Sequence, residues 1–121
     1  MSKAKNAPAV ERHFQDKQPV VRQTYEALLA SLREIGPFVE DPKKTSIHLV
    51  RETALAGIAT RKEHLVLTLK SDHRLPGTRV HRTQQASAKR FHSEIKLTSP
   101  LDVDKELKQW LRHAYELSGK R

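Results

Sequence analysis

The sequence predicts an α+β fold, in which an antiparallel sheet of four to five strands carries an N-terminal and a C-terminal helix on one face. Segments near both ends of the chain repeat apolar residues with the 3.6-residue period of a helix. The segments between them alternate with the two-residue period of a strand. Breaks of only two or three residues separate several strands, which favours hairpins and antiparallel pairing. The expected order is α-β-β-β-β-α.

A short tail is expected to precede a single domain. Residues 1–10 are small, polar and basic, which is typical of a disordered basic tail. Residues 11–121 are expected to form one α+β domain, because a chain of 121 residues supports one modest core. Around the boundary, residues 10–16 have the pattern of one helical turn that would dock Phe14 on the domain.

The N-terminal helix is expected over residues 19–35. Its apolar stripe consists of Val21, Tyr25, Leu28, Leu29, Leu32 and Ile35. Pro19 suits the first turn, where a backbone N–H would have no partner within the helix. Gly36 and Pro37 predict the end of the helix, because glycine tolerates a left-handed cap and proline cannot continue a helix.

The middle of the chain alternates like strands. The expected strands cover residues 46–51, 54–60, 64–70 and 89–98. Between the last two lie eighteen residues with Pro76-Gly77, few apolar side chains and many charges. Because so long a structureless loop is unusual in a small domain, we expect a short fifth strand around residues 79–83.

The C-terminal helix is expected over residues 99–118. Ser99 is a good N-cap and Pro100 suits the first helical position. Asp102 and Asp104 place negative charge at the positive end of the helix dipole. The buried stripe would consist of Val103, Leu107, Trp110, Leu111, Ala114 and Leu117. Two such helices side by side would bury their stripes against the apolar face of the sheet.

The composition argues against several classes of protein. Without cysteine there are no disulfides, no thiolate chemistry and no cysteine-ligated zinc. No apolar run approaches the roughly 18 residues that cross a bilayer, and the first twenty residues lack the apolar stretch of a secretory signal. We therefore expect a cytoplasmic protein without membrane contact. The P-loop, G-x-G-x-x-G and G-x-S-x-G motifs are absent, so no cofactor is expected.

The formal net charge of +9 is concentrated in the middle of the chain. Residues 43–92 carry eleven basic and three acidic side chains, and such a clustered field attracts polyanions or acidic partners. The candidate anion-binding residues are Lys44, Arg61, Lys62, Arg74, Arg79, Arg82, Lys89 and Arg90. No aromatic residue in the basic stretch could stack on bases, so nucleic-acid binding is expected to be weak and independent of sequence.

Strand alternation places three histidines, His48, His64 and His92, on the sheet face that points away from the helices. With Lys96 on the same face, they could hold an anion or cleave a phosphodiester by acid–base catalysis. The smallest gap between them is sixteen residues, whereas metal ligands usually include a close pair, so no metal site is expected. Glu94 and Lys96 have the E-x-K spacing of metal-dependent nucleases, but we favour a cross-strand ion pair for Glu94.

Several short motifs occur in a recognisable order. They are Lys44-Thr45-x-Ile47, Ala56-Gly57-Ile58, Arg61-Lys62-x-His64-Leu65, Phe91-His92, Leu97-Thr98-Ser99-Pro100-x-Asp102-Val103-Asp104-x-Glu106-Leu107 and Trp110-Leu111-x-x-Ala114-Tyr115. Together, from about residue 20 to residue 115, they resemble a bacterial family known as a domain of unknown function (number fifty-six fifty-five). That family occurs alone and as a C-terminal appendage of larger proteins, some of which resemble nucleases. The resemblance implies no catalytic positions, and only by analogy does it favour nucleic-acid work.

These observations favour a module that binds rather than catalyses. Its expected partner is anionic: a nucleic-acid backbone, a phosphorylated ligand or an acidic protein surface. Two alternatives stay open. One is a histidine-dependent phosphodiesterase or nuclease-like enzyme that uses His48, His64, His92 and Lys96. The other is a homodimeric accessory domain that pairs through the side of the sheet bearing Val50 and Val66.

Overall fold

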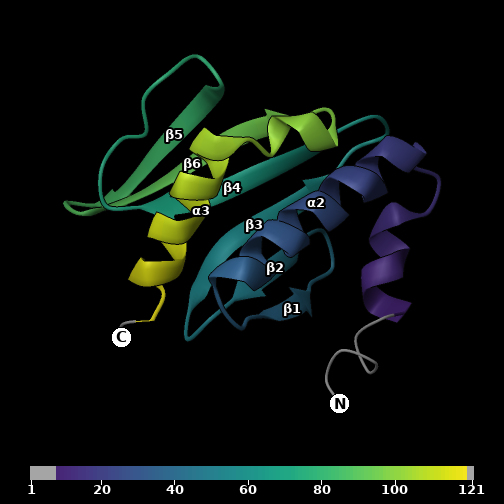
Figure 1. The fold of residues 1–121 in the computed structure, drawn as a ribbon, viewed down its shortest axis with the longest axis horizontal. Helices are drawn as coiled ribbons and strands as arrows, with labels where there is room; N and C mark the ends of the chain where they lie inside the picture. The colour runs from purple at the N-terminus through teal and green to yellow at the C-terminus, as the bar shows by residue number, and fades with distance from the viewer. Residues whose placement is uncertain (1–7, 120–121) are drawn as a thin grey trace.

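The computed structural model describes residues 8–119, which form an α+β domain with one six-stranded antiparallel sheet. Its elements are η1 (Arg12–Phe14), α2 (Pro19–Ile35), β1 (Val39–Pro42), β2 (Ile47–Val50), β3 (Ala54–Thr60), β4 (Leu65–Ser71), β5 (Val80–Ser87), β6 (Arg90–Leu97), η2 (Pro100–Asp102) and α3 (Lys105–Leu117). Both long helices lie on the same face of the sheet (Figure 1). The predicted fold class is therefore confirmed, whereas the predicted count of four to five strands is wrong.

The two strands that alternation did not predict correctly are the edges of the sheet. β1 has the sequence Val-Glu-Asp-Pro and pairs with β2, and β5 runs for eight residues instead of the expected 79–83. Every residue of β5 after Val80 except Thr83 is exposed. Edge strands tolerate proline and charge and do not need an apolar face, so their sequences lack the two-residue pattern.

The order of strands is β1-β2-β3-β4-β6-β5, so β6 lies between β4 and β5. Strands β1 to β4 form a meander, and residues 72–79 then cross to the far side of β6. The buried side chain of Leu75 anchors this connection. As a result, β6 pairs with β4 from Phe91 to Leu97, and Lys70 lies directly opposite His92.

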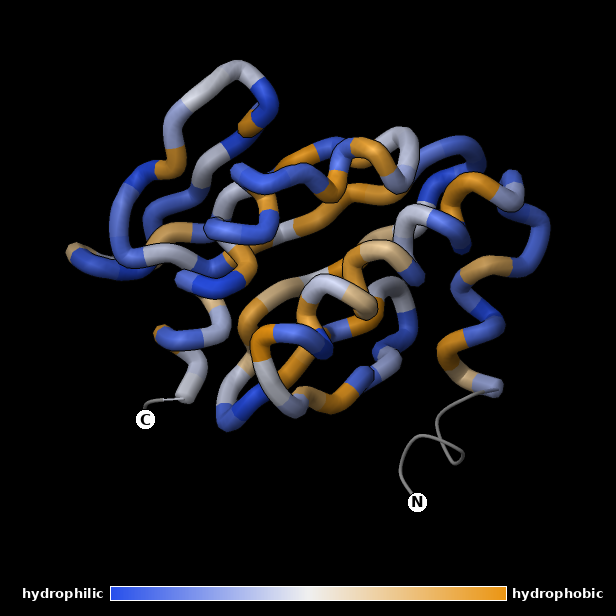
Figure 2. Tube along the Cα trace, viewed as in Figure 1, coloured by the Kyte–Doolittle hydropathy of each residue, from blue (hydrophilic) through white to orange (hydrophobic). Residues whose placement is uncertain are grey.

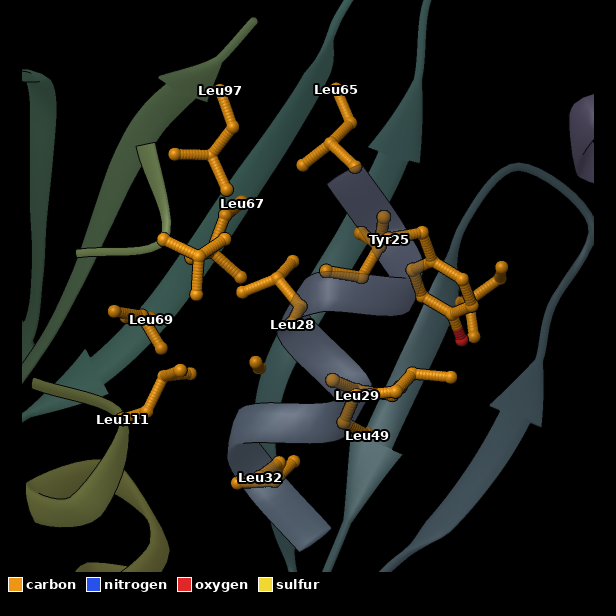
Figure 3. Close-up of a cluster of buried hydrophobic side chains, with 14 of the residues drawn as sticks. Tyr25, Leu28, Leu29, Leu32, Leu49, Leu65, Leu67, Leu69, Leu97 and Leu111 are labelled. Atoms are coloured by element: carbon orange, nitrogen blue, oxygen red, sulfur yellow. The ribbon is translucent and has the colours of Figure 1, made fainter. Parts of the chain in front are cut away.

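The core fills the space between the sheet and the two helices. Figure 3 shows leucines of β4 facing those of α2 and α3, and Figure 2 shows apolar segments gathered in the middle of the molecule. Among the residues that are fully buried there are Tyr25, Leu28, Leu32, Ile47, Leu49, Ile58, Leu65, Leu67, Leu69, Ile95 and Leu97. In β2, β4 and β6, the apolar side chains of the predicted alternation therefore point toward the helices. The side chains between them point to the opposite, outer face of the sheet.

The N-terminal region packs against α2. Phe14 lies 5.1 Å from the Tyr25 ring, measured between ring centroids, which confirms the predicted docking of a helical turn. Of the predicted tail, residues 1–7 lie outside the described residues. Residues 8–10 are helical, and Val10 is buried in the core.

Gly36 ends α2, but not for the predicted reason. Its φ of 167° and ψ of −179° are extended rather than left-handed, and any residue can adopt them. The constraint is space, because a Cβ at this position would overlap the Tyr115 hydroxyl oxygen and lie 2.8 Å from Tyr115 Cζ. That hydroxyl donates a hydrogen bond to the Pro37 carbonyl at 2.9 Å. Glycine therefore allows α3 to pack closely against the end of α2.

The C-terminal helix begins later than predicted. Ser99 caps the separate turn η2, where its hydroxyl accepts a hydrogen bond from the Leu101 N–H at 3.1 Å. Asp104 is the N-cap of α3 and accepts from the Leu107 N–H at 3.0 Å. The two caps follow each other so closely that the sequence pattern merged two elements into one.

Within residues 8–119, no helix is long and apolar enough to span a bilayer.

Candidate anion-binding site

A groove of about 340 Å³ runs across the outer face of the sheet, on the side opposite the helices. It is lined by Ser46, His48, Ala54, Leu55, Ala56, Gly57, Ile58, Ala59, Thr68, Lys70 and His92. The groove lies over β3, which presents Gly57 and Ala59 outward between larger side chains of β2 and β4, and Leu55 and Ile58 of β3 also line it. His48 and Thr68 lie opposite Gly57 on β2 and β4. A Cβ at Gly57 would lie 3.8 Å from His48 Cδ2, so the imidazole borders the space above the glycine.

Lys70 lies at one end of this groove and is only 7% exposed. Its ammonium donates a hydrogen bond to Thr53 Oγ1 at 2.9 Å. Among residues 8–119, no carboxylate lies within 4.0 Å of the Lys70 nitrogen. Burial, and after it the charge of Arg90, lowers the pKa of Lys70. A buried ammonium without a counter-ion costs stability, and an anion from solution would offset that cost.

Arg90 adds a second positive charge near Lys70 and His92 adds an imidazole, and we call these three residues the basic cluster. His92 faces Lys70 across the β4–β6 pair. Burial, then Arg90, then Lys70 lowers the pKa of His92, so its imidazole is neutral at pH 7 and keeps one donor and one acceptor nitrogen. The Nε of Arg90 is buried and has no hydrogen-bond partner within the described part of the chain. The basic cluster therefore offers several donors, and none of residues 8–119 forms an ion pair with it.

The three strand histidines do not converge. His64 and Lys96 line a second hollow of about 400 Å³, together with Val66, Thr78, Arg79 and His81. His48 and His92 share the first groove, but β3 and β4 separate their strands. Three strand spacings place their backbones roughly 14 Å apart. Burial, then Lys96 and Arg61, lowers the pKa of His64, and Glu63 opposes that effect.

The eight predicted anion-binding residues are widely dispersed, and only Arg90 belongs to the basic cluster. Lys44, Arg61, Lys62 and Lys89 are exposed around the ends of strands. The Arg74 guanidinium lies over the Phe91 ring, 5.6 Å from its centroid. Arg82 lies 3.9 Å from Glu94, and His81 lies 3.4 Å from the same carboxylate. The ion pair expected for Glu94 is thus present, across strands β5 and β6.

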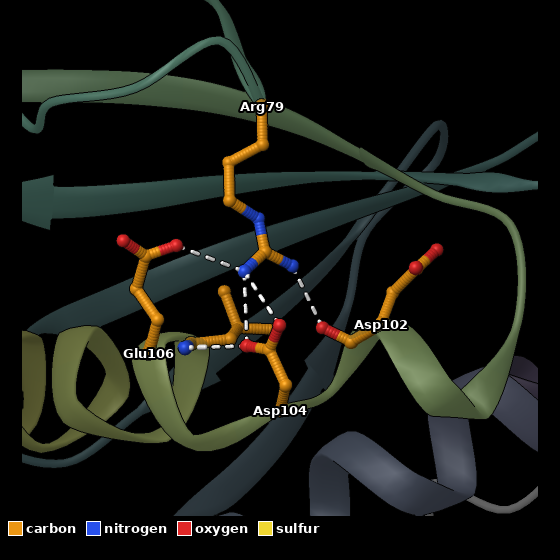
Figure 4. Close-up of polar contacts among 5 residues, drawn as sticks. Arg79, Asp102, Asp104 and Glu106 are labelled. Carbon is orange, nitrogen blue, oxygen red and sulfur yellow. Dashed lines mark hydrogen bonds and ion pairs between the residues drawn. The ribbon is translucent and has the colours of Figure 1, made fainter.

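The Arg79 side chain is already bound by residues at the start of α3 (Figure 4). Its Nη1 donates to Asp104 at 2.9 Å and to Glu106 at 3.1 Å, and its Nη2 donates to the Asp102 carbonyl at 2.8 Å. The side chain is 23% exposed and lies over the Trp110 ring. Arg79 therefore binds the start of β5 to the first turn of α3, and two carboxylates already balance its charge.

We expect Arg79→Ala to lower the free energy of unfolding by about 1–2 kcal/mol, because several charge-assisted hydrogen bonds are lost and two carboxylates lose their ion-pair partner. Urea denaturation followed by circular dichroism measures this change. Arg82→Ala is the matched control, because its side chain is 67% exposed and should change stability by no more than about 0.5 kcal/mol. Equal losses in the two variants would contradict a specific role for Arg79.

Sequence reasoning did not select Lys70. A signal exists, because Lys70 carries a charge in a strand whose other residues are buried or half-buried. Its importance depends on its neighbour His92, and that pairing could not be foreseen, because β5 separates β4 from β6 along the chain.

Comparison with known proteins places the chain in a family. Searches of the curated proteins and of the solved structures found no match. A family model described as "Domain of unknown function (DUF5655)" matches residues 10–118, which include every helix and strand from η1 to α3. The resemblance inferred from the motifs is thereby confirmed, and the chain belongs to the DUF5655 family.

Proposed function

We propose that this domain binds a small phosphorylated ligand in the groove of the outer sheet face, without transforming it. The observation that carries the proposal is the buried ammonium of Lys70, which has no carboxylate partner among the described residues. A phosphate group at this end of the groove would receive hydrogen bonds from Lys70 and His92, which both line it, and the nearby charge of Arg90 would favour the anion.

The rest of the groove favours a ligand with an apolar or flat part. The residues of β3 that line it are all apolar, and they include the small residues Ala54, Gly57 and Ala59 beside Leu55 and Ile58. Thr68 and His48 add polar groups along its length, which would orient the ligand. A volume of about 340 Å³ fits a small molecule. A nucleic-acid backbone is less favoured, because it needs a row of phosphate contacts and the other cations are dispersed.

Titration with two probes tests the proposal. Inorganic phosphate and phenyl phosphate are added to ¹⁵N-labelled protein, and the amide signals are followed by NMR. Both probes should cause saturable shifts at Lys70 and His92. Phenyl phosphate should bind about fivefold more tightly, which about 40 Å² of additional apolar burial would supply.

A variant of Gly57 separates the apolar part of the groove from its basic end. The position accepts a side chain, because a Cβ there makes only an ordinary contact. Gly57→Val should weaken phenyl phosphate binding about fivefold, because the valine fills the groove and removes the advantage of the phenyl ring, and should change phosphate binding by less than about twofold. Ala86→Val, on the exposed edge strand β5, is the control. Absence of saturable shifts at Lys70 and His92, or equal effects of the two valines, would refute the proposal.

Each alternative function predicts a different result when the same protein and variants are tested. Cleavage of a phosphodiester by a pair of histidines needs both imidazoles on one phosphate, and the roughly 14 Å between the backbones of His48 and His92 disfavours that mechanism. Turnover of bis(p-nitrophenyl) phosphate that disappears in His92→Ala would favour the enzyme. Salt-sensitive binding of duplex DNA, with no shifts from either small probe, would favour a nucleic-acid backbone as the partner. A dimer detected by light scattering, in a protein whose groove binds neither probe, would favour pairing of two copies through Val50 and Val66.

A further inference from the structure

We propose that Asp72, His73 and His113 form a binding site for a divalent transition-metal ion of the zinc type. Asp72 Oδ1 lies 2.8 Å from His73 Nδ1 and 3.0 Å from His113 Nε2. All three donor atoms lie within 4.8 Å of one another, and the rings are tilted by 50° with centroids 5.2 Å apart. No other group of three histidine or acidic residues within residues 8–119 converges in this way.

The cluster is held by two separate parts of the fold. Asp72 and His73 follow β4 directly, and the buried Ser71 hydroxyl donates to the His73 carbonyl at 2.5 Å. The buried Leu75 fixes the chain just beyond them. His113 lies on α3 between the buried residues Leu111 and Ala114, so the helix packs firmly at this point. A rigid turn and a rigid helix therefore bring the donor atoms together.

The donor set matches the chemistry of zinc. Two imidazole nitrogens and one carboxylate oxygen are a common protein ligand set for Zn²⁺, which leaves a further position for water. Zinc–ligand bonds near 2.1 Å give a tetrahedron with edges of roughly 3.4 Å. The two separations from Asp72 Oδ1 are slightly shorter, so a small outward movement of the rings would admit the ion. Without an ion, the same separations suit hydrogen bonds that hold the carboxylate between the rings.

This site uses none of the three strand histidines, for which the sequence predicted no metal site. Asp72 and His113 are 41 residues apart and come from different elements, so spacing alone gives no sign of it. Mg²⁺ and Ca²⁺ prefer oxygen ligands and would not be expected to compete.

Calorimetric titration of the full chain with ZnCl₂, in buffer free of phosphate, tests the site. We expect one tight site in the wild-type protein and an increase in Tm on zinc addition. His113→Ala and Asp72→Asn should each weaken zinc binding by about tenfold or more. His81→Ala removes an exposed histidine of β5 and should leave the affinity within about twofold. MgCl₂ in place of zinc should give no heat of binding.

A second measurement does not depend on the variants. Zinc should shift the imidazole nitrogen signals of His73 and His113 in the wild-type protein and leave those of the strand histidines in place. The site would be refuted if zinc does not bind, if the imidazole shifts occur elsewhere, or if His81→Ala weakens binding as much as His113→Ala does. Its failure would leave the proposed phosphate site untouched, because the two sites share no residue.

Discussion

Gly36→Ala should lower the free energy of unfolding by about 2–3 kcal/mol, near the upper end of what overpacking costs in a filled core. The added Cβ would overlap the Tyr115 hydroxyl oxygen. The ring cannot move away cheaply, because it is buried, the Arg51 guanidinium lies 4.2 Å from its centroid, and its hydroxyl is bound to Pro37. Urea denaturation of the two proteins measures the difference.

A double-mutant cycle identifies the cause of that loss. Tyr115→Leu removes the ring and its hydroxyl, so the alanine at position 36 should then cost less than about 0.5 kcal/mol. If Gly36→Ala is equally destabilising in both backgrounds, the loss arises from the chain conformation at the end of α2. The close approach of Tyr115 would then not explain the glycine.

Lys70→Met should have opposite effects on binding and on stability. Phosphate affinity should fall about tenfold or more, which corresponds to about 1.4 kcal/mol. The free energy of unfolding should rise by about 1 kcal/mol, because a buried charge without a counter-ion is removed, and Tm should rise by about 4 °C. NMR titration and thermal denaturation measure the two effects. Lys96→Met is the control, because Lys96 lies on the same face but is exposed.

The pH dependence gives an independent check on Lys70. Its pKa is lowered in the folded state from an ordinary value of 10.5, so the unfolded chain binds more protons between the two values. Stability of the wild-type protein should therefore rise relative to Lys70→Met as the pH rises toward 10.5. A constant difference across that window, or a variant that is less stable and binds phosphate normally, would mean that Lys70 is structural.

Sequence patterns predicted the parts of this fold that face a full core. The stripe of α2 and the alternation of β4 are governed by burial, and both were located nearly to the residue. β1 and most of β5 have no such constraint, because each pairs on one side only. Gly36 shows a different limit, because its neighbour Tyr115 is 79 residues away along the chain and no local pattern reveals such contacts.

The candidate sites show what the alternation of side chains along a strand can and cannot predict. Alternation placed His48 and His92 on the outer face, and both line the groove. It could not tell which strands are adjacent, so it grouped His64 with them and overlooked Lys70. Charge counts selected Arg79 as an anion contact, although its carboxylate partners on α3 lie more than twenty residues away.

The position of β6 between β4 and β5 also affects how the chain reaches its native state. During synthesis, β4 emerges well before the only strand that can complete its second row of backbone hydrogen bonds. The nascent domain therefore exposes one unpaired edge of the apolar strand β4 until residue 97 has left the ribosome. The hairpin of β5 and β6 is local and can form first. The sheet is then completed when this preformed hairpin docks on the free edge of β4. Such long-range closure is the expected rate-limiting event of folding.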